Sequence, residues 1–372
     1  MHRKTWNRSA WALSLLALLL TPPIAASAST DFCEVRYEQI DLGSLSSSSR
    51  SDAHAINNRG HVTGNSAATT FLWSCGTGME DIGQSIGRPD NVGVALNERD
   101  QVIVYVAPQY PQMVPDVLLW ERGKPAIVLD PNRQFFPEAI TNSGAMVYAD
   151  RLWTQATGLT QFDLGISIVS SHLTNFGRLG GVFFDDATLE TRIFTWTRRE
   201  GVKDLGSSLG ESTFSMDIND RGDLLVDASS TELRTAYIMD REGNVELLPR
   251  RADVLYLYPT RMNLHREVIG AELTNEFQPN GVRSRNFVWD ARQGYRNLDE
   301  LVGYTLGNSF EPASINDWGW IVGNRRDFNT TLLVPVPAQV RRFENLNRLR
   351  GQQLCRALDE VKLHRLLCSV RD

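Results

Sequence analysis

Nucleophilic hydrolysis needs a serine or cysteine that a nearby histidine activates, and this chain has few histidines for that role. Beyond residue 28 they are His54, His61, His172, His265 and His364. Three of them fall at turns of an internal repeat. The sequence therefore favours a non-enzymatic protein, and we assign no catalytic residue from it.

Metal binding is the second chemistry that the residues could support. Zinc requires a spaced cluster of His and Cys, but His54 and His61 lie seven residues apart across a predicted turn without a third partner nearby. The segment that starts at Asp217 begins like a calcium loop. However, Arg221 occupies its fifth position and Ala228 its twelfth, where a bidentate glutamate belongs. We predict neither a metal ion nor another cofactor.

Paired carboxylates could hydrolyse or cleave a glycosidic bond. The adjacent pairs Asp185-Asp186 and Asp299-Glu300 lie in predicted loops. Neighbouring side chains on a strand point to opposite sides, so solvated loop charge is the simpler interpretation. A polysaccharide-acting hydrolase or lyase, with carboxylates at a central channel, stays open as an alternative function.

The first 28 residues have the organisation of a signal peptide. Basic residues precede an apolar run over residues 11–20, and Ala26-Ser27-Ala28 supplies the small residues that a signal peptidase accepts. The apolar run is too short to cross a bilayer, which takes about 20 residues. We therefore expect cleavage after Ala28, export to the periplasm or the medium, and no transmembrane segment in the mature chain.

The four cysteines of an exported chain are expected to form disulfides. Cys33 and Cys75 flank the first repeat, whereas Cys355 and Cys368 share the C-terminal segment. Three pairings are possible, and proximity favours Cys33–Cys75 and Cys355–Cys368. The second pairing requires the chain to turn back, because an unbroken helix would separate the two residues by about 20 Å.

Charge argues against one class of partner. The chain has a net charge of −6, although residues 338–372 carry more Lys and Arg than Asp and Glu. The preceding residues are therefore more acidic than the total suggests. Because an acidic surface repels phosphate backbones, nucleic acid is not an expected partner.

An internal repeat dominates the chain. Its first copy contains Ile56-Asn57-Asn58-Arg59-Gly60, followed by a strand with Phe71-Leu72-Trp73. The Asn57 position, called the marker here, recurs at residues 97, 141, 174, 219, 263 and 316, which makes seven copies. A period of about 43 residues is typical of a four-stranded propeller blade and too long for a β-helix rung or a leucine-rich repeat.

Each copy contains the signals of short strands and turns. Asparagine in N-x-x-G can bond its own backbone, and glycine accepts positive φ at the turn exit. The last strand ends in Asp-Leu-Gly or a similar element, as at Asp204-Leu205-Gly206. We predict an all-β, seven-bladed β-propeller over residues 29–337 whose third-strand tryptophans pack between blades. These tryptophans are at positions 73, 120, 153, 196 and 289, and Met239 and Val334 replace them in two copies.

The closure of the ring can also be predicted. The strand Tyr37–Leu42 precedes the first marker, while the seventh copy ends at Leu332–Val334 without an Asp-Leu-Gly strand. Because the last blade must meet the first, we predict that Tyr37–Leu42 completes the seventh blade.

The I-N-x-x-G-x-V-x-G element, the Phe-Leu-Trp strand and the Asp-Leu-Gly element resemble the HAF repeats of bacterial extracellular proteins. The resemblance covers about residues 37–337 and weakens in the third and sixth copies, where Arg266 takes a glycine position. It implies a bacterial secreted or surface repeat protein, and it carries over no catalytic residue.

Residues 338–372 have a helical pattern. Leu354, Leu358 and Val361 repeat at helical spacing after an interruption at Gly351. We expect a basic, amphipathic helical pair folded against the propeller; the alternative is a docking element for another envelope protein.

The predicted function is recognition of an envelope or extracellular protein, a peptide or a glycan through the propeller loops. The insertions 105–115 and 272–285 are the predicted contact surface, with Tyr105, Tyr110 and Phe277 as candidate contacts. A structural envelope component docked through the C-terminal helices is a further alternative.

Overall fold

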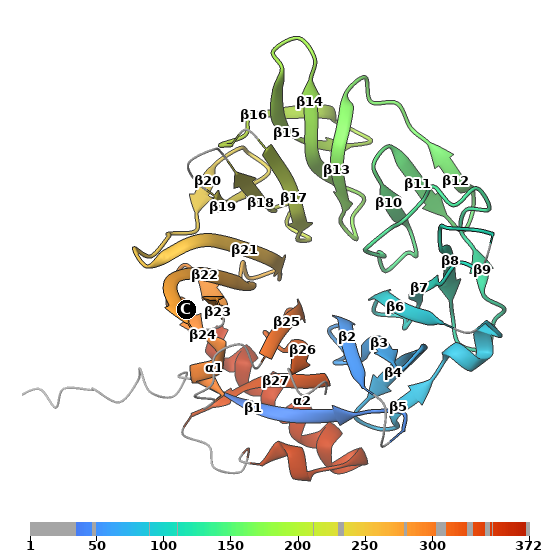
Figure 1. Ribbon diagram of the computed structural model, residues 1–372, viewed down its shortest axis with the longest axis vertical. Helices are drawn as coiled ribbons and strands as arrows, with labels where there is room; N and C mark the ends of the chain where they lie inside the picture. The colour runs from blue at the N-terminus through green and yellow to red at the C-terminus, as the bar shows by residue number, and fades with distance from the viewer. Residues whose placement is uncertain are drawn as a thin grey trace, which may run out of the picture.

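A ring of seven antiparallel sheets forms the molecule, as the computed structural model shows (Figure 1). The structure describes residues 35–46, 50–88, 90–109, 111–210, 212–229, 234–278, 281–302, 310–325, 330–338, 343 and 345–369. Neighbouring sheets follow one another around a central axis in chain order. The predicted seven-bladed β-propeller is confirmed.

The first four blades use consecutive strands. Blade 1 comprises β2 (Ser51–Ile56), β3 (Val62–Ser66), β4 (Thr69–Ser74) and β5 (Gly78–Asp81). Blade 2 comprises β6 (Asn91–Leu96), β7 (Val102–Val106), β8 (Asp116–Trp120) and β9 (Ile127–Val128). Blade 3 has β10 (Met146–Tyr148), β11 (Arg151–Thr154) and β12 (Gly158–Gln161), and blade 4 has β13 (Ser167–Leu173), β14 (Leu179–Asp185), β15 (Glu190–Thr197) and β16 (Gly201–Ser207).

The remaining blades complete the ring. Blade 5 comprises β17 (Ser212–Ile218), β18 (Leu224–Ser229), β19 (Arg234–Met239) and β20 (Val245–Leu247). Blade 6 comprises β21 (Val254–Met262), β22 (Val268–Gln278), β23 (Gly281–Asp290) and β24 (Gly294–Asn297), followed by the short helix α1 (Leu298–Leu301). Blade 7 combines β25 (Phe310–Ile315), β26 (Ile321–Arg325) and β27 (Thr330–Pro337) with β1 (Val35–Gly43).

The seventh blade closes the ring with a strand from the other end of the chain. Strand β1 pairs antiparallel with β27, so that Tyr37 lies opposite Pro335 and Ile40 opposite Leu332. The predicted closing strand is therefore confirmed.

Blade 3 departs from the four-stranded prediction. Its sheet has three strands in the described structure, because residues 135–141 take the place of an innermost strand without pairing to β10. Pro137 lies in this segment, and proline cannot donate to a strand ladder. The gap that results is important for the site described below.

Hydrophobic side chains pack between neighbouring blades. Trp73 joins the cluster shared by blades 7 and 1, Trp120 the cluster between blades 1 and 2, and Trp289 the cluster between blades 5 and 6. Met239 and Val334 are equally buried in their copies. Stacking of the blades on their apolar faces therefore accounts for the tryptophan of the repeat.

The final glycine of the repeat element has a steric cause. The innermost strand of blade 1 has a bulge between Ala53 and Ala55, which brings the Asp52 carbonyl oxygen over Gly64. A Cβ on Gly64 would lie 2.0 Å from that oxygen. Gly323 in blade 7 is in the same position, with the Glu311 carbonyl oxygen 2.3 Å from an added Cβ.

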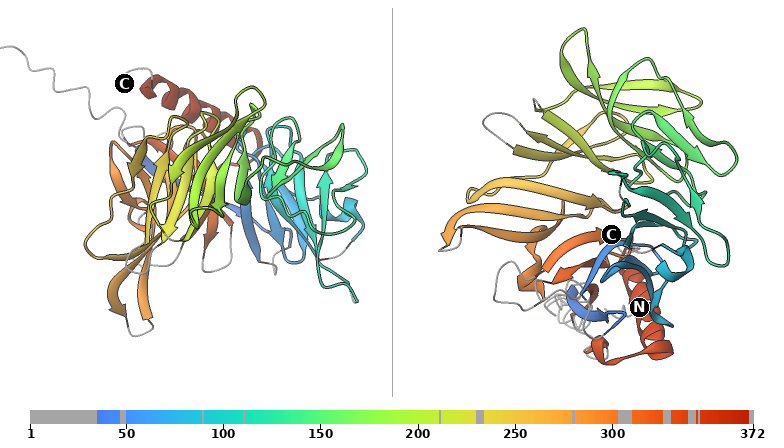
Figure 2. Two further views of the ribbon diagram at one scale, coloured as in Figure 1. Left: turned by 90° about the horizontal axis from the view of Figure 1, so that it is seen from above. Right: turned by 45° about the vertical axis from the view of Figure 1, so that its right-hand side comes forward.

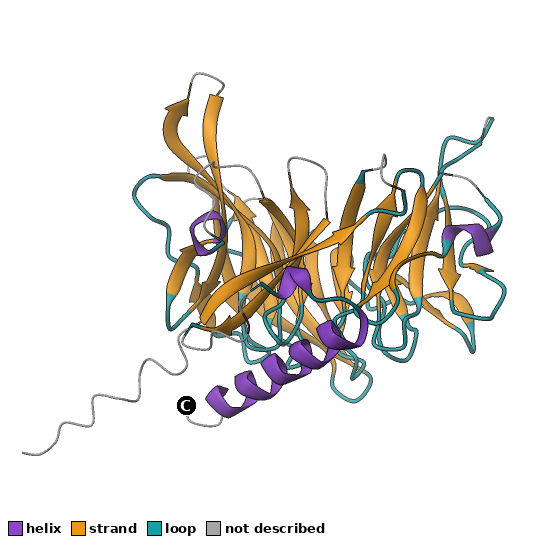
Figure 3. Cartoon of the chain, turned by 90° about the horizontal axis from the view of Figure 1, so that it is seen from below, coloured by secondary structure: helices purple, strands orange, loops and turns teal. Residues whose placement is uncertain are grey.

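The C-terminal segment packs on the ring as one long helix rather than the predicted pair. A 3-10 turn (Leu346–Arg348) leads into α2 (Gly351–Ser369). Leu354, Leu358 and Val361 are almost fully buried in the cluster between blades 7 and 1. Figures 2 and 3 show α2 along one face of the ring, while the β22–β23 hairpin projects beyond the opposite face. No described helix is long and apolar enough to cross a membrane.

The favoured disulfide pairing was wrong. Cys75, after β4, is bonded to Cys355 in α2, across a sequence separation of 280 residues. Helix α2 continues unbroken past Cys355, so the turn that a Cys355–Cys368 bond requires is absent from this described helix. Cys33 and the side chain of Cys368 lie outside the described part of the structure.

Candidate functional site

The marker residue closes the turn between the first two strands of each blade. In blade 1 the Asn57 Oδ1 accepts hydrogen bonds from the amides of Arg59 (3.1 Å) and His61 (2.9 Å), while Gly60 has φ 84°. The asparagines at 97, 219, 263 and 316 repeat this arrangement. The N-x-x-G element is therefore the predicted turn.

The same asparagines also connect neighbouring blades. The Asn57 Nδ2 donates to the Asn97 carbonyl oxygen at 2.9 Å, and the Asn316 Nδ2 donates to the Asn57 carbonyl oxygen at 2.9 Å. Asn97 and Asn263 make the equivalent bonds to the next markers, Thr141 and Asn316, at 2.9 and 3.0 Å. One side chain thus satisfies a turn and joins two blades.

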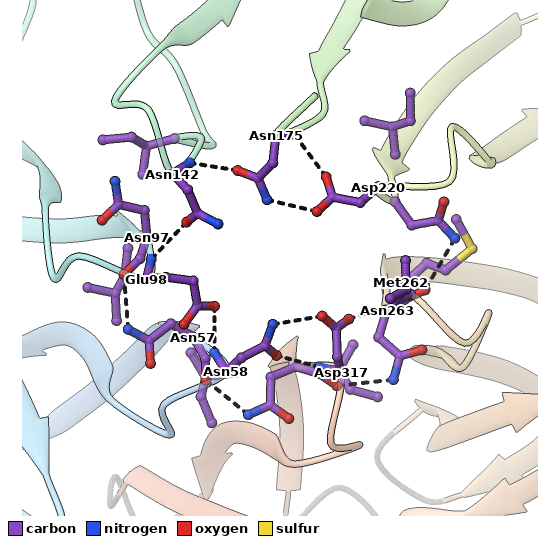
Figure 4. A pocket seen from close by; sticks show the side chains of 18 residues that line it. Asn57, Asn58, Asn97, Glu98, Asn142, Asn175, Asp220, Met262, Asn263 and Asp317 are labelled. Atoms are coloured by element: carbon purple, nitrogen blue, oxygen red, sulfur yellow. Dashed lines mark hydrogen bonds between the residues drawn. The ribbon is translucent and has the colours of Figure 1, made fainter. Parts of the chain in front are cut away.

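A second ring of hydrogen bonds involves the residues that follow the markers. The amide of Asn58 donates to Glu98 Oε1 (2.8 Å), and the amide of Glu98 donates to Asn142 Oδ1 (3.0 Å). The bonds continue through Asn175 and Asp220 and resume at Asp317. Figure 4 shows these polar side chains around the axis, where they line a pocket of about 640 Å³ that opens to solvent.

Three carboxylates, those of Glu98, Asp220 and Asp317, line this axial pocket. The hydrolase alternative requires acidic side chains at such a place. However, both oxygens of Asp220 accept from Asn175, and those of Asp317 accept from Leu264 and Asn58. Burial raises the pKa of Glu98, and the nearby charge of Asp317 raises it further. The axial carboxylates therefore act as ties between blades, and their arrangement explains the ring's cohesion.

A second cavity lies where blade 3 lacks an innermost strand. We call it the third-blade recess. It lies between residues 138–149 and strands β13 and β17, and its polar side chains are Glu138, Thr141, Tyr148, Ser170, Ser171, His172 and Ser215. The cavity has a volume of about 750 Å³, including the part open to solvent.

Hydrogen bonds fix the wall that strand β13 contributes to the recess. The Ser170 and Ser215 hydroxyls lie 2.8 Å apart, and Ser171 Oγ donates to the Ala149 carbonyl oxygen at 2.9 Å. His172 Nε2 lies 2.8 Å from the Ser215 carbonyl oxygen, an acceptor, so Nε2 carries the proton. Burial lowers the pKa of His172, which keeps the imidazole neutral and leaves Nδ1 as an acceptor.

The ring of Tyr148 forms part of the other wall. The Tyr148 ring is half-exposed and packs at right angles on Phe136, with ring centroids 5.9 Å apart. Phe136 in turn contacts Tyr105, whose hydroxyl donates to the Pro137 carbonyl oxygen at 3.3 Å. These contacts hold the unpaired segment beside the recess.

The candidate contacts from the sequence lie in different places. Tyr105 is on β7, half-buried against the recess wall rather than on a loop. Tyr110 lies outside the described residues. Phe277 is on β22, in a long hairpin with β23, and its side chain is outside the description. Binding by these three residues stays a prediction.

The other sequence candidates have structural partners. His54 bonds Asn65, and His61 bonds Asp100. Asp223 of the calcium-like segment is buried and accepts two hydrogen bonds from Arg266, at 2.8 and 3.0 Å. In the described structure no group of three or more His, Cys, Asp and Glu side chains is placed to hold a metal ion.

The carboxylate pairs do not form a catalytic dyad in loops. Asp185 ends β14 and caps the following turn by accepting from the Ala187 amide at 3.0 Å. Asp299 is buried at the start of α1, so the expectation that this carboxylate is solvated loop charge was wrong. Its neighbour Glu300 is exposed.

Exposed apolar side chains occur toward one mouth of the channel on four neighbouring blades. The innermost strands end at the marker turns on one face of the ring. Their first residues therefore lie on the other face, from which the β22–β23 hairpin projects. Five large apolar residues that are 40–51% exposed follow one another there on blades 3 to 6. This hairpin-side crescent consists of Tyr148, Val169, Phe214, Leu255 and Tyr256.

Comparisons with known proteins support the fold. No family model and no curated protein matches the chain. Among solved structures the chain is similar to a streptogramin B lyase, with a TM-score of 0.51 and 9% identity over 81% of this chain and 98% of that one. It is also similar to the WD40 propeller domain of Doa1, with a TM-score of 0.48 and 11% identity over 81% of this chain and 97% of that one. At 9% identity, the likeness to the lyase shows the fold alone.

Proposed function

We propose that this chain is an exported, non-enzymatic binding propeller that recognises a protein, peptide or glycan at the hairpin-side mouth of its channel. The observation that carries the proposal is the crescent of exposed apolar side chains. Contiguous apolar patches on a folded surface typically mark interaction sites, whereas scattered ones do not. Phe214 and Tyr256, on neighbouring blades, are 51% and 45% exposed.

The surroundings of the crescent favour a rigid recognition surface. The long β22–β23 hairpin rises on the same face and is anchored at its base by a buried charge cluster. There Glu272 is 1% exposed and pairs with both Arg251 and Arg285. Rigid elements around a channel mouth lower the ordering cost of binding.

Export is supported by two observations. The Cys75–Cys355 disulfide fits an oxidising compartment, and the first 28 residues have the pattern of a signal peptide. Docking of a partner through the tail is less favoured, because Leu354, Leu358 and Val361 of α2 are already buried against the ring.

The proposal can be tested by capture from envelope and culture-medium fractions on immobilised mature protein. The test variant combines Phe214→Ser with Tyr256→Ser. The matched control combines Phe176→Ser with Leu189→Ser, which are 83% and 74% exposed outside the crescent. We expect the captured ligand to be lost with the test variant only. Equal capture by both variants would refute the crescent as the binding surface.

A further inference from the structure

We propose that the third-blade recess is a subsite for one or two units of a neutral, hydroxyl-rich saccharide. The inference rests on the proposed function, since the recess and the crescent share Tyr148 and Val169. A glycan that lies across the crescent would therefore place one of its units in the recess.

The hydrogen-bonding groups of the recess match sugar hydroxyls. Each hydroxyl of a sugar donates one hydrogen bond and can accept others, as do the hydroxyls of Ser170 and Ser215. The neutral imidazole of His172 adds an acceptor, because its Nε2 proton is used by the Ser215 carbonyl oxygen. The Glu138 carboxylate adds further acceptors at the open side.

Charge favours a neutral ligand over an anionic one. The described residues that line the recess include one carboxylate, Glu138, and no lysine or arginine. Beyond this lining, the charges that act on His172 are those of Asp217 and Arg261, which have opposite signs. A phosphate or uronate group would therefore meet repulsion from Glu138 without a cation lining the cavity.

The aromatic wall supplies the apolar part of recognition. Tyr148 is 42% exposed, and two T-shaped contacts fix its ring, with centroids 6.5 Å from Phe135 and 5.9 Å from Phe136. A fixed aromatic ring beside a few oriented polar groups is the usual composition of a small-ligand site.

An extended peptide fits the recess less well. Such a peptide would pair with the free edge of β10 and supply the missing innermost strand. However, β10 is only three residues long, Met146–Tyr148, and Ser171 already binds the Ala149 carbonyl oxygen next to it. The edge therefore provides too few main-chain groups to hold a strand.

Saturation-transfer NMR with neutral hexasaccharides tests the proposal. The probes are the hexaoses of the cello-, malto-, manno-, xylo- and chito- series, added to the mature protein. We expect at least one series to bind. Tyr148→Ala and Ser170→Ala should each weaken that binding by about tenfold, the effect of losing one stacking or hydrogen-bonding contact of ordinary strength. Tyr148→Phe keeps the ring and should bind like the wild type.

The controls separate loss of binding from loss of fold. The Phe176→Ser variant alters an exposed residue in a marker turn and should bind sugar normally. Urea unfolding midpoints show whether the recess variants remain folded. If a series binds equally well to Tyr148→Ala and Ser170→Ala, the recess is not the subsite and the proposal fails.

Together with the capture assay, this experiment separates failure of the saccharide proposal from failure of the proposed binding function. If no hexaose binds while capture from the envelope still depends on Phe214 and Tyr256, the saccharide proposal is overturned and the binding propeller stands. A captured polypeptide that is lost with Tyr148→Ala would identify a peptide ligand instead. Failure of both assays would overturn both proposals.

Discussion

The side-chain amide of Asn57 joins two blades, because its Nδ2 donates to the carbonyl oxygen of Asn97 at 2.9 Å while its Oδ1 closes its own turn. The repeat therefore requires asparagine, because the amide oxygen closes the turn and the amide nitrogen bonds the next blade. Aspartate could close the turn but could not donate. Thr141 and Thr174, the two exceptions, close their turns with a hydroxyl and have no amide to give.

We predict that Asn57→Asp destabilises the propeller by about 1–3 kcal/mol, because the variant loses a buried hydrogen bond to the Asn97 carbonyl oxygen and places a carboxylate beside it. Asn57 is 4% exposed, and its Nδ2 also lies 3.2 Å from Asp100 Oδ1, so a carboxylate would add repulsion. Urea unfolding measures the change. Asn132→Asp, on an exposed turn, is the control and should stay close to the wild type.

The glycine on the second strand provides a steric prediction. Gly64→Ala would place a Cβ 2.0 Å from the Asp52 carbonyl oxygen, which is a backbone atom and cannot rotate away. We expect a loss of about 1–3 kcal/mol, as for other overpacked sites. Gly76→Ala is the matched control, since the nearest atom to its Cβ would be Cys355 Sγ at 3.8 Å. Equal melting temperatures of the two variants would contradict this explanation of the repeat.

The fold was predictable because each blade repeats the same local chemistry. The marker turn, the third-strand tryptophan and the closing strand Tyr37–Leu42 are all short-range signals, and the structure confirms them. The blade-to-blade hydrogen bond of Asn57 was not predicted, because it depends on a register between segments 40 residues apart. The periodicity of the sequence shows which residues recur, but it does not show which of their atoms form hydrogen bonds between blades.

The candidate site was largely missed, and one signal could have revealed it. Pro137 interrupts the segment just before the third marker, where an innermost strand belongs. A missing strand predicts a gap. The residues that line it, such as Ser170, His172 and Ser215, come from the next two blades and carry no motif of their own.

The disulfide gives a prediction by elimination. Cys75 and Cys355 are bonded, so two further oxidised cysteines in the same chain, Cys33 and Cys368, can pair only with each other. Peptide mapping without reduction should find these two links, and a Cys33–Cys75 peptide would contradict the structure. Replacing Cys75 and Cys355 together by serine should cost about 2–4 kcal/mol, because the bond closes a long loop.

The pH dependence of stability should reveal the buried histidine. Burial lowers the pKa of His172 in the folded protein, whereas the unfolded chain protonates near its ordinary value of about 6.5. The unfolded state therefore takes up the proton first as the pH falls. Stability should decrease below about pH 6.5 and level off once the pH passes the folded pKa. In urea unfolding, the His172→Gln variant should lack this decrease in stability between the two pKa values. A pH profile identical to that of the wild type would contradict the prediction.

The link between tail and propeller supplies the last prediction. Arg365 of α2 donates to Glu267 of blade 6 at 2.6 Å, and the two side chains are 25% and 12% exposed. Burial alone would raise the pKa of Glu267, but the charge and hydrogen bond of Arg365 hold it below its ordinary value. Removing the arginine therefore leaves a buried carboxylate that ionises at a cost.

Arg365→Met should destabilise the protein by about 3–5 kcal/mol near neutral pH, the range for breaking a buried ion pair from one side. The wild type loses the contribution of the pair as the pH falls through the folded pKa of Glu267, and the variant is relieved when this carboxyl protonates. The difference between the two proteins should therefore shrink toward pH 4. The double variant Glu267→Met with Arg365→Met should recover most of the loss, because it leaves no charge unpaired. If the two single effects add in the double variant, the residues are not coupled and this ion pair does not hold the tail on the ring.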